Sequence, residues 1–232
     1  MSIHCASGGA NGLDATSHLS NPQACTKLIW VKHDSNPSAY NSLVGATDSG
    51  ITNYAAINSG SAVLSVQTGS GTFTNFPSAP TFTNWNCLIL TLATAGANSA
   101  NGYWQDNAGG GFVTKAATGV SFTNFYDWIG GFGSLNVGLT LAYYMEWSVV
   151  LGSTDRATQF LSATPVVQLG SLRRYLALTN AASAKTDTSG NGFNFDNILG
   201  SITDGATLPT FPASVFPVRR IARRFTPVSF SH

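Results

Sequence analysis

The sequence LTLAYYMEWSVVLGSTDRATQFLS, Leu139–Ser162, carries the clearest sign of how this chain folds. Its first part, Leu139–Val150, is enriched in aromatic and β-branched residues, and this composition predicts a long strand. Its second part, Ser153–Leu161, opens with Ser, Thr and Asp and continues with helix-compatible residues before Pro165. This pattern predicts one short helical turn soon after the strand.

Further segments show the same enrichment or alternate polar with apolar residues, and we expect each to be a strand. These segments are Thr26–Lys32, Tyr54–Ile57, Ala62–Gln67, Asn86–Leu92 and Asn101–Gln105. Turns rich in Gly, Asn and Ser separate them, such as ATDSGITN at 46–53 and DNAGGG at 106–111. The segments do not repeat at a fixed period, so a propeller or solenoid is disfavoured. Many short strands joined by such turns predict a β-sandwich or barrel.

Charged side chains are scarce, since they make up 9% of the 232 residues against roughly 25% in an average protein. Weak charge repulsion between copies favours association, so we expect a homo-oligomer. No cationic segment with a following apolar run begins the chain, and no stretch approaches about 18 consecutive apolar residues. We therefore expect neither a signal peptide nor a membrane partner. Cys5, Cys25 and Cys87 are widely spaced and odd in number, which favours free thiols.

Short signatures follow one another in a characteristic order. They are TKLIWVKHDS (Thr26–Ser35), TNWNCLILTL (Thr83–Leu92), NGYWQDNAGGG (Asn101–Gly111), DWIGGFG (Asp127–Gly133) and the Leu139–Ser162 stretch. In this order they resemble the concanavalin A-like lectin/glucanase, or laminin-G-like, domains over about residues 26–165. The resemblance implies an all-β fold, namely an antiparallel β-sandwich jelly roll.

The domain organisation follows from this resemblance and from the composition of the C-terminal part. Residues 171–209 resemble the leading segment of such modules, although here they follow the body. We therefore expect a sandwich over 1–205, in which 166–205 either completes its own sheets or pairs with an edge strand of a neighbouring copy. Residues 206–232 are rich in proline and arginine, and proline at this density predicts an extended C-terminal arm.

The arm is the first candidate binding site. It places four arginines among apolar residues, and we expect partner contacts from Arg219, Arg220, Arg223, Arg224 and Phe225. Such a cluster suits carboxylates, phosphates or a protein surface. Nucleic acid is disfavoured as a partner, because a chain of net charge +1 lacks the broad basic face of nucleic-acid-binding proteins.

Enzymatic chemistry is not expected. Glycoside hydrolysis needs two carboxylates, whereas Glu146 is the only glutamate and the residues that follow it supply no second acid on its face. An aspartate pair from Asp48, Asp106 and Asp127 is formally available, but aspartates of this kind are more typical of turns. The pentapeptide G-x-S-x-G of serine hydrolases is absent. We predict no catalytic residues and no cofactor.

Two weaker sites remain as alternatives. Asp187, Ser189 and Asn191 resemble the opening of a calcium loop, but Ile198 stands where the closing acid belongs, so we favour a turn and no metal. Exposed aromatics beside acids suit a sugar, which makes Trp104, Asp106 and Tyr126 candidate glycan contacts. Tyr103 and Trp104 point to opposite faces of one strand, so at most one of them is exposed.

Two functions fit this sequence. Jelly rolls of this type occur in bacteriophage particles, and the resemblance implies a non-enzymatic structural virion protein. In this interpretation it is a capsid decoration or accessory protein, assembled in the host cytoplasm and anchored by its arm to the major capsid protein or other virion proteins. The alternative is a carbohydrate-binding adhesin, or a tail or fibre receptor-binding module, that recognises a surface glycan. Fold analogy alone does not choose between them.

Overall fold

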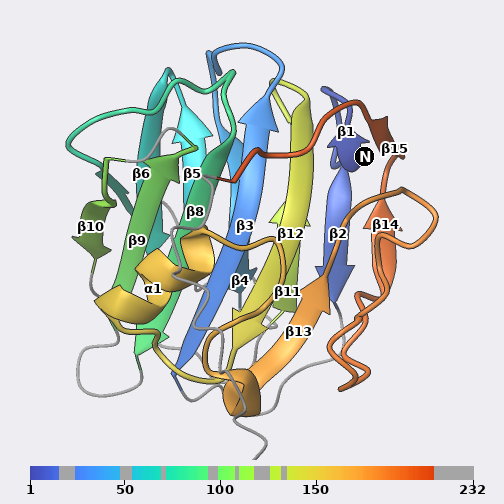
Figure 1. Ribbon diagram of the computed structural model, residues 1–232. Coiled ribbons are helices and arrows are strands. Elements are labelled where there is room, and N and C mark those ends of the chain that lie inside the picture. The colour runs from blue at the N-terminus through green and yellow to red at the C-terminus, as the bar shows by residue number, and fades with distance from the viewer. Residues whose placement is uncertain are drawn as a thin grey trace, which may run out of the picture.

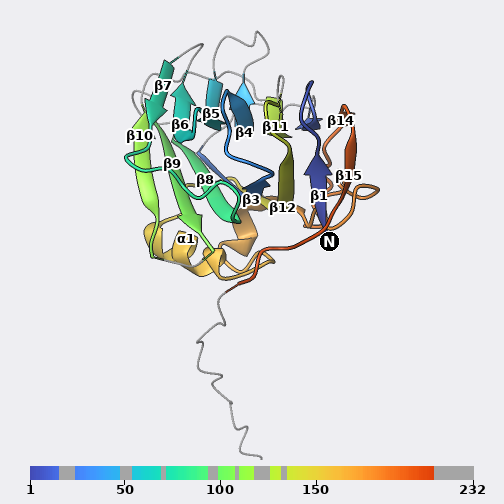
Figure 2. The same cartoon turned by 90° about the horizontal axis from the view of Figure 1, so that it is seen from above.

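The computed structural model describes residues 1–15, 24–47, 54–68, 72–93, 99–107, 110–117, 126–131 and 135–211. Two antiparallel sheets pack face to face in this part of the chain, and a short helix lies on the outer side of one sheet (Figures 1 and 2). The predicted antiparallel β-sandwich is therefore confirmed. No helix among the described residues is both long and apolar enough to span a membrane.

The first sheet carries the helix. Its strands in spatial order are β10 (Val113–Ala117), β9 (Ser99–Asp106), β8 (Asn86–Ala93), β3 (Cys25–His33), β12 (Leu139–Trp147), β1 (Ser2–Cys5) and β15 (Ile202–Gly205). β13 (Leu172–Leu176) pairs with part of β12 beside this row. Helix α1 (Ser153–Phe160) crosses the outer face of this sheet (Figure 1). A 3₁₀ turn, Leu169–Ser171, leads into β13.

The second sheet forms the opposite layer. Its strands in spatial order are β14 (Asn197–Leu199), β2 (Gly12–Ala15), β11 (Tyr126–Gly130), β4 (Asn41–Thr47), β5 (Tyr54–Gly60), β6 (Val63–Thr68) and β7 (Thr72–Asn75). Each neighbouring pair is antiparallel. The chain passes repeatedly from one sheet to the other, as Figure 2 shows from above.

The strands predicted from the sequence are found within three residues of their expected ends, and α1 ends one residue earlier than expected. The strands that were not predicted include β1, β2 and β7, which have four residues each and are too short to show a period. Residues 166–205 contribute β13, β14 and β15, which pair with β12, β2 and β1 of the same chain. In the described residues the strands of this segment thus pair within their own chain.

The main core lies between the sheets and follows from strand alternation. In β3, Ile29 and Val31 point into this core, whereas Leu28 and Trp30 point to the outer face of the first sheet. A strand with apolar residues on both faces needs cover on both sides. The second sheet covers one face, and a separate layer must cover the other.

That outer layer consists of α1 and the extended residues 206–211. Trp30 stacks on Phe160 of α1 with ring centroids 5.2 Å apart, and its edge meets Phe211 at 5.3 Å. Phe211 also lies 5.6 Å from the Tyr143 ring. The first residues of the predicted arm therefore lie against the sandwich (Figure 2). Together these contacts form a second hydrophobic core outside the first sheet.

A bulge in β12 determines which of its side chains enter the main core. The pairing of β12 with β3 shifts between Ala142 and Met145, and Tyr143 there adopts a left-handed φ of 52°. Leu141 points into the interior, and regular alternation would turn Tyr144 to the outer face. The extra residue reverses this alternation, so Tyr144 points into the interior as well. Glu146, two residues further, is consequently buried as well.

Burial of His33 leads to a testable pH dependence of stability. This residue ends β3 with Nε2 2.9 Å from the Ser59 hydroxyl, and burial lowers its pKa to about 4. The unfolded chain has a histidine pKa near 6.5, so at intermediate pH it binds a proton that the folded chain does not. The free energy of unfolding should thus fall by about 3 kcal/mol as pH drops from about 7 to 4.

Chemical denaturation across this pH range measures the effect. His33→Gln, which keeps a polar group near Ser59 but does not titrate, should remove most of the slope. An equally steep slope in this variant would assign the pH dependence to other groups.

Candidate functional site

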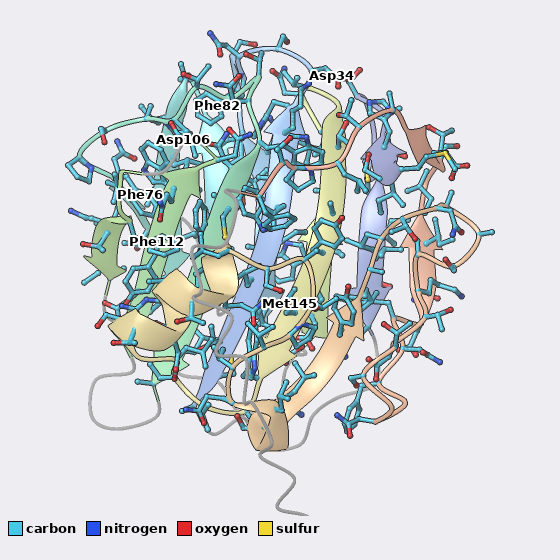
Figure 3. The ribbon with its side chains drawn as sticks, viewed as in Figure 1. Asp34, Phe76, Phe82, Asp106, Phe112 and Met145 are labelled. Carbon is cyan, nitrogen blue, oxygen red and sulfur yellow. The ribbon has the colours of Figure 1, made fainter. Side chains whose placement is uncertain are left out.

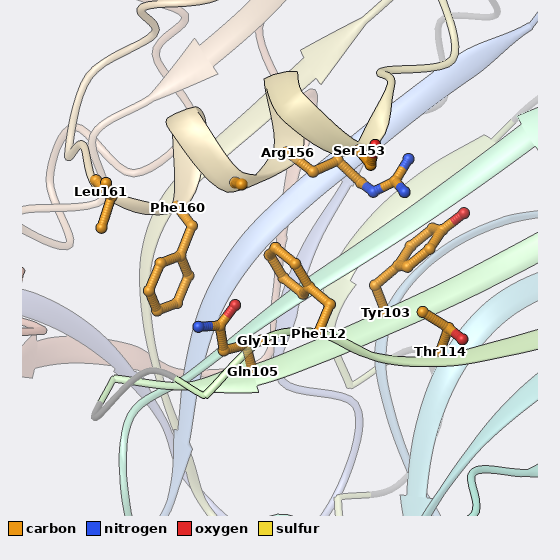
Figure 4. Close-up of a pocket in the computed structure, with 10 residues that line it drawn as sticks. Tyr103, Gln105, Gly111, Phe112, Thr114, Ser153, Arg156, Phe160 and Leu161 are labelled. Atoms are coloured by element: carbon orange, nitrogen blue, oxygen red, sulfur yellow. The ribbon is translucent and has the colours of Figure 1, made fainter.

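A groove on the outer face of the first sheet is the candidate binding site. It encloses about 570 Å³ between α1 on one side and β9 with the residues leading into β10 on the other (Figure 4). The lining residues are Tyr103, Gln105, Gly111, Phe112, Thr114, Ser153, Arg156, Ala157, Phe160 and Leu161. An open hollow of this size, with aromatic walls and a few polar groups, is typical of a small-ligand site.

Strand alternation builds the floor of the groove. Tyr103 and Gln105 point outward from β9, while Trp104 between them enters the main core. Thr114 of β10 pairs with Tyr103 and faces the same side. The two adjacent strands therefore present a phenol, an amide and a hydroxyl to one hollow. No hydrogen bond joins the Gln105 amide to another residue of the described chain, and Figure 4 shows this amide between Phe112 and Phe160.

Aromatic contacts join the two walls of the groove. The Phe112 ring meets Tyr103 edge to face at 6.4 Å and Phe160 at 5.8 Å. Phe160 is buried because it also stacks on Trp30 beneath the helix. In Figure 3, Phe112 lies beside α1. Tyr103 and Phe112 remain partly exposed, so their rings are available to a ligand.

Arg156 supplies the groove's charge. Its guanidinium carbon lies 4.0 Å above the Tyr103 ring centroid, a cation–π contact, and its Nη1 donates a hydrogen bond of 2.5 Å to the Leu151 carbonyl. These two contacts fix the plane of the guanidinium. Among the residues that line the groove, Arg156 alone is charged.

A second polar cluster lies in the main core and braces the two sheets. Lys27 of β3 contacts Asp127 of β11 at 2.5 Å and Glu146 of β12 at 3.4 Å. Arg174 of β13 contacts the same two carboxylates, at 3.3 Å each. The Tyr144 hydroxyl donates to Glu146 at 3.0 Å. These four charged side chains are at most 2% exposed, and a third cation, the partly exposed Arg173, lies 3.9 Å from Glu146.

The protonation of this cluster follows from its pairing. Burial alone would lower the pKa of Lys27, but Asp127 and Glu146 outweigh burial and hold that pKa well above its ordinary value. Burial would likewise raise the pKa of Asp127, yet Lys27 and Arg174 outweigh it and lower that pKa. The cluster therefore stays charged in the folded protein.

This cluster gives Glu146 an acidic neighbour that the residues following it in the sequence do not supply. Asp127, far away in sequence, approaches from the opposite sheet and shares Lys27 and Arg174 with Glu146. Both carboxylates are held in ion pairs and shielded from solvent. Because glycoside hydrolysis requires carboxylates that reach a substrate, this arrangement suits a structural brace rather than an acid pair for catalysis.

The predicted glycan contacts do not come together. Trp104 lies in the main core with its side chain 9% exposed, because alternation turns it inward, so its ring is not free to stack on a sugar. Asp106 ends the same strand, well above Phe112 and α1 in Figure 3. Tyr126 begins β11 in the opposite sheet, and its side chain lies outside the described residues. The outward residue of the aromatic pair is Tyr103.

The weak calcium candidate is a turn. The Asp187 carboxylate accepts hydrogen bonds from the backbone amides of Tyr175, Ser189 and Phe193 and from the Ser189 hydroxyl. Burial would raise the pKa of Asp187, but these donors outweigh it and lower that pKa. Asn191 donates its amide to the Leu172 and Arg173 carbonyls. Within the described residues, no three His, Cys, Asp or Glu side chains cluster as metal ligands.

The predicted arm contacts, Arg219, Arg220, Arg223, Arg224 and Phe225, lie outside the described residues.

A smaller hollow of about 250 Å³ lies on the second sheet between Tyr40 and Phe73. The Tyr40 hydroxyl lies 3.0 Å from the Asn58 amide oxygen and 2.9 Å from that of Gln67. Polar groups beside this hollow are therefore already paired with one another.

Comparisons with known proteins bear on the fold. Neither a scan against protein-family models nor a search of curated proteins finds a match. Among solved structures, a native heptameric SAP-like pentraxin from Limulus polyphemus is 11% identical, with a TM-score of 0.50, covering 71% of this chain and 84% of that one. The binding domain of botulinum neurotoxin DC in complex with SialylT is 8% identical, with a TM-score of 0.44, covering 67% and 45%.

At this level of identity the pentraxin likeness concerns the fold alone. It agrees with the jelly-roll sandwich expected from the resemblance to concanavalin-like domains. Function has to be argued from the groove itself.

The residues that line the groove were mostly missed by sequence reasoning. Arg156 and Phe160 belong to α1, Phe112 belongs to the residues leading into β10, and the fold brings these two segments together over β9. The alternation rule was the one signal that pointed to the site, because it requires either Tyr103 or Trp104 to face outward.

Proposed function

We propose that this protein is a carbohydrate-binding module whose binding site is the groove between α1 and β9. The observation that carries the proposal is the combination of two partly exposed rings, Tyr103 and Phe112, with the largely buried Gln105 amide, which lines the same open hollow and forms no hydrogen bond to the described residues. A sugar ring has an apolar face, which suits an aromatic wall, and hydroxyl groups at its rim, which suit amides and hydroxyls.

The other polar groups of the groove support this choice. Thr114 and Ser153 are exposed and face the hollow from opposite walls, β10 and the first turn of α1. The walls themselves are parts of the sandwich and its second core, so a ligand meets a preformed surface and little ordering is needed on binding. The Tyr40–Phe73 hollow is a weaker candidate, because it is smaller and the amides beside it are already engaged.

Tyr103 provides the first test. Tyr103→Ala removes the ring that forms the floor, so affinity for the glycans that bind the wild-type protein on an array should fall about 10-fold or more. Tyr103→Phe keeps the ring and should retain most of the affinity. Isothermal titration calorimetry of the best array hit with each variant measures both effects.

The control is Phe73→Ala, which removes an exposed ring from the second sheet and should leave glycan affinity unchanged. If no glycan binds the wild-type protein, or if Phe73→Ala weakens binding and Tyr103→Ala does not, the assignment of a glycan site to this groove is wrong.

The interpretation as a bacteriophage capsid decoration protein depends on residues 212–232, which fall outside the described part of the chain. It stays a prediction from the sequence, as do the capsid partners and the homo-oligomer. The two interpretations are compatible, since a glycan-binding sandwich can be carried on a larger particle.

A further inference from the structure

One edge of the Arg156 guanidinium forms no hydrogen bond to the described residues. Nη1 is occupied by the Leu151 carbonyl, whereas Nε is buried without a hydrogen-bond partner among the described residues. An arginine presents its donors in two parallel pairs, and Nε with Nη2 forms the lateral pair. No hydrogen bond to the described residues uses this lateral pair. A buried donor left unpaired is unfavourable, which points to a missing acceptor.

No carboxylate among the described residues supplies that acceptor. Arg156 forms no ion pair within the described residues, in contrast to Lys27 and Arg174, whose charges are fully compensated. The nearest acid in sequence, Asp155, instead accepts a hydrogen bond from Gln168 at 3.0 Å. Lys115 of β10 pairs with Gly102, which faces the second sheet, and so points away from the groove. The groove therefore holds one uncompensated positive charge.

This charge is held in place before any ligand arrives. The Tyr103 ring beneath the guanidinium and the Leu151 carbonyl beside it restrict its orientation. A planar, fixed fork of two N–H donors matches the two oxygens of a carboxylate, and hydrogen bonds between charged groups are roughly twice as strong as neutral ones.

We infer that the groove selects acidic sugars, and that the Arg156 guanidinium binds the carboxylate of a uronic or sialic acid residue beside the Tyr103 ring. This inference rests on the proposed glycan-binding function and specifies its ligand class. The sugar ring packs against the exposed parts of the Tyr103 and Phe112 rings, and the Gln105 amide and the Ser153 hydroxyl contact its remaining hydroxyl groups. Such a ligand supplies the acceptor that Arg156 lacks.

The test compares matched ligands. Trigalacturonate and its neutral methyl ester share the same sugar backbone and differ in charge and in the small ester methyl groups. Sialylated and sulfated oligosaccharides on the same array separate carboxylate from sulfate. Wild-type protein should bind the acidic trisaccharide or the sialylated glycans at least about 10-fold more tightly than their neutral counterparts. Raising the salt concentration should weaken binding of the acidic ligand and leave the neutral one nearly unchanged. This salt dependence needs no variant.

Variants then assign the preference to one residue. Arg156→Gln should bring the affinities for acidic and neutral ligands to within about 2-fold of each other, and Arg156→Lys should restore only part of the difference, because lysine keeps the charge but lacks the fork. Lys115→Gln removes a charge of the same sign outside the groove and should leave the preference intact. Thermal melting verifies that each variant is folded.

The outcomes separate the two proposals. If neutral and acidic glycans bind equally, if sulfated glycans alone bind, or if Arg156→Gln keeps the preference, the acidic-sugar inference is overturned while glycan binding stands. If no glycan of any charge binds, both proposals fail.

Discussion

Replacing Lys27 with methionine should lower the free energy of unfolding by about 3–5 kcal/mol. Lys27 is fully buried and lies between Asp127 and Glu146, which come from opposite sheets. Without its ammonium group, Asp127 loses its closest cation, and the two buried carboxylates keep Arg174 and the partly exposed Arg173, which lies 3.9 Å from Glu146. Breaking a buried pair costs much more than a surface pair contributes, because the remaining charge cannot be solvated.

Chemical denaturation of Lys27→Met measures this loss. Lys32→Met, on the same strand but partly exposed, is the matched control and should change stability by no more than about 0.5 kcal/mol. Adding Asp127→Asn to Lys27→Met removes the buried carboxylate that has lost its closest cation and should recover part of the stability. Equal effects of Lys27→Met and Lys32→Met would contradict the role assigned to the buried cluster.

The second large effect is expected for Trp30→Ala, which should destabilise the protein by about 3–5 kcal/mol. Trp30 is fully buried on the outer face of the first sheet, where it contacts Phe160 of α1 and Phe211 of the extended segment. Removal of the Trp30 ring leaves a cavity beneath Phe160 and Phe211. Because Phe160 is also a wall of the groove, α1 should lose its fixed position and glycan affinity should fall as well.

Two measurements separate these consequences. Denaturation gives the loss of global stability, and hydrogen exchange reports whether the amides of α1 lose protection more than those of β3. Phe73→Ala, which truncates an aromatic that is 46% exposed, should alter neither stability nor exchange by a comparable amount. Unchanged protection of α1 in Trp30→Ala would show that the helix does not depend on this second core.

The fold was largely predictable because most strands are long enough to show their pattern. Thr26–Lys32 and Asn86–Leu92 are apolar runs bounded by turns, and both form central strands, β3 and β8. Ser153–Leu161 carries polar residues at its start and no strand pattern, and it forms α1. For these elements the local sequence pattern was sufficient to predict the secondary structure.

Other features depend on contacts that local sequence does not encode. The bulge at Tyr143 is invisible in an unbroken run of aromatic and apolar residues, yet it decides that Tyr144 and Glu146 point inward. Asp127 meets Glu146 only because β11 and β12 lie in facing sheets. The pattern of β9 alone does not say which face is covered, so it could not decide whether Tyr103 or Trp104 is the outward residue.

The site was the least predictable part for the same reason. Arg156 looked like an ordinary helical residue, and Phe112 like part of a glycine-rich turn, until the fold placed both above Tyr103. Side chains that belong to different elements form a ligand site only through the tertiary arrangement, which spacing in sequence does not reveal.

The most direct test of glycan binding in the groove is amide chemical-shift mapping by NMR with the glycan that binds most strongly on an array. The largest shifts should fall on 103–105, 111–114 and 153–161, the segments that form the floor and walls of the groove. Shifts concentrated instead around Tyr40 and Phe73 on the second sheet would contradict the assignment of the site to this groove.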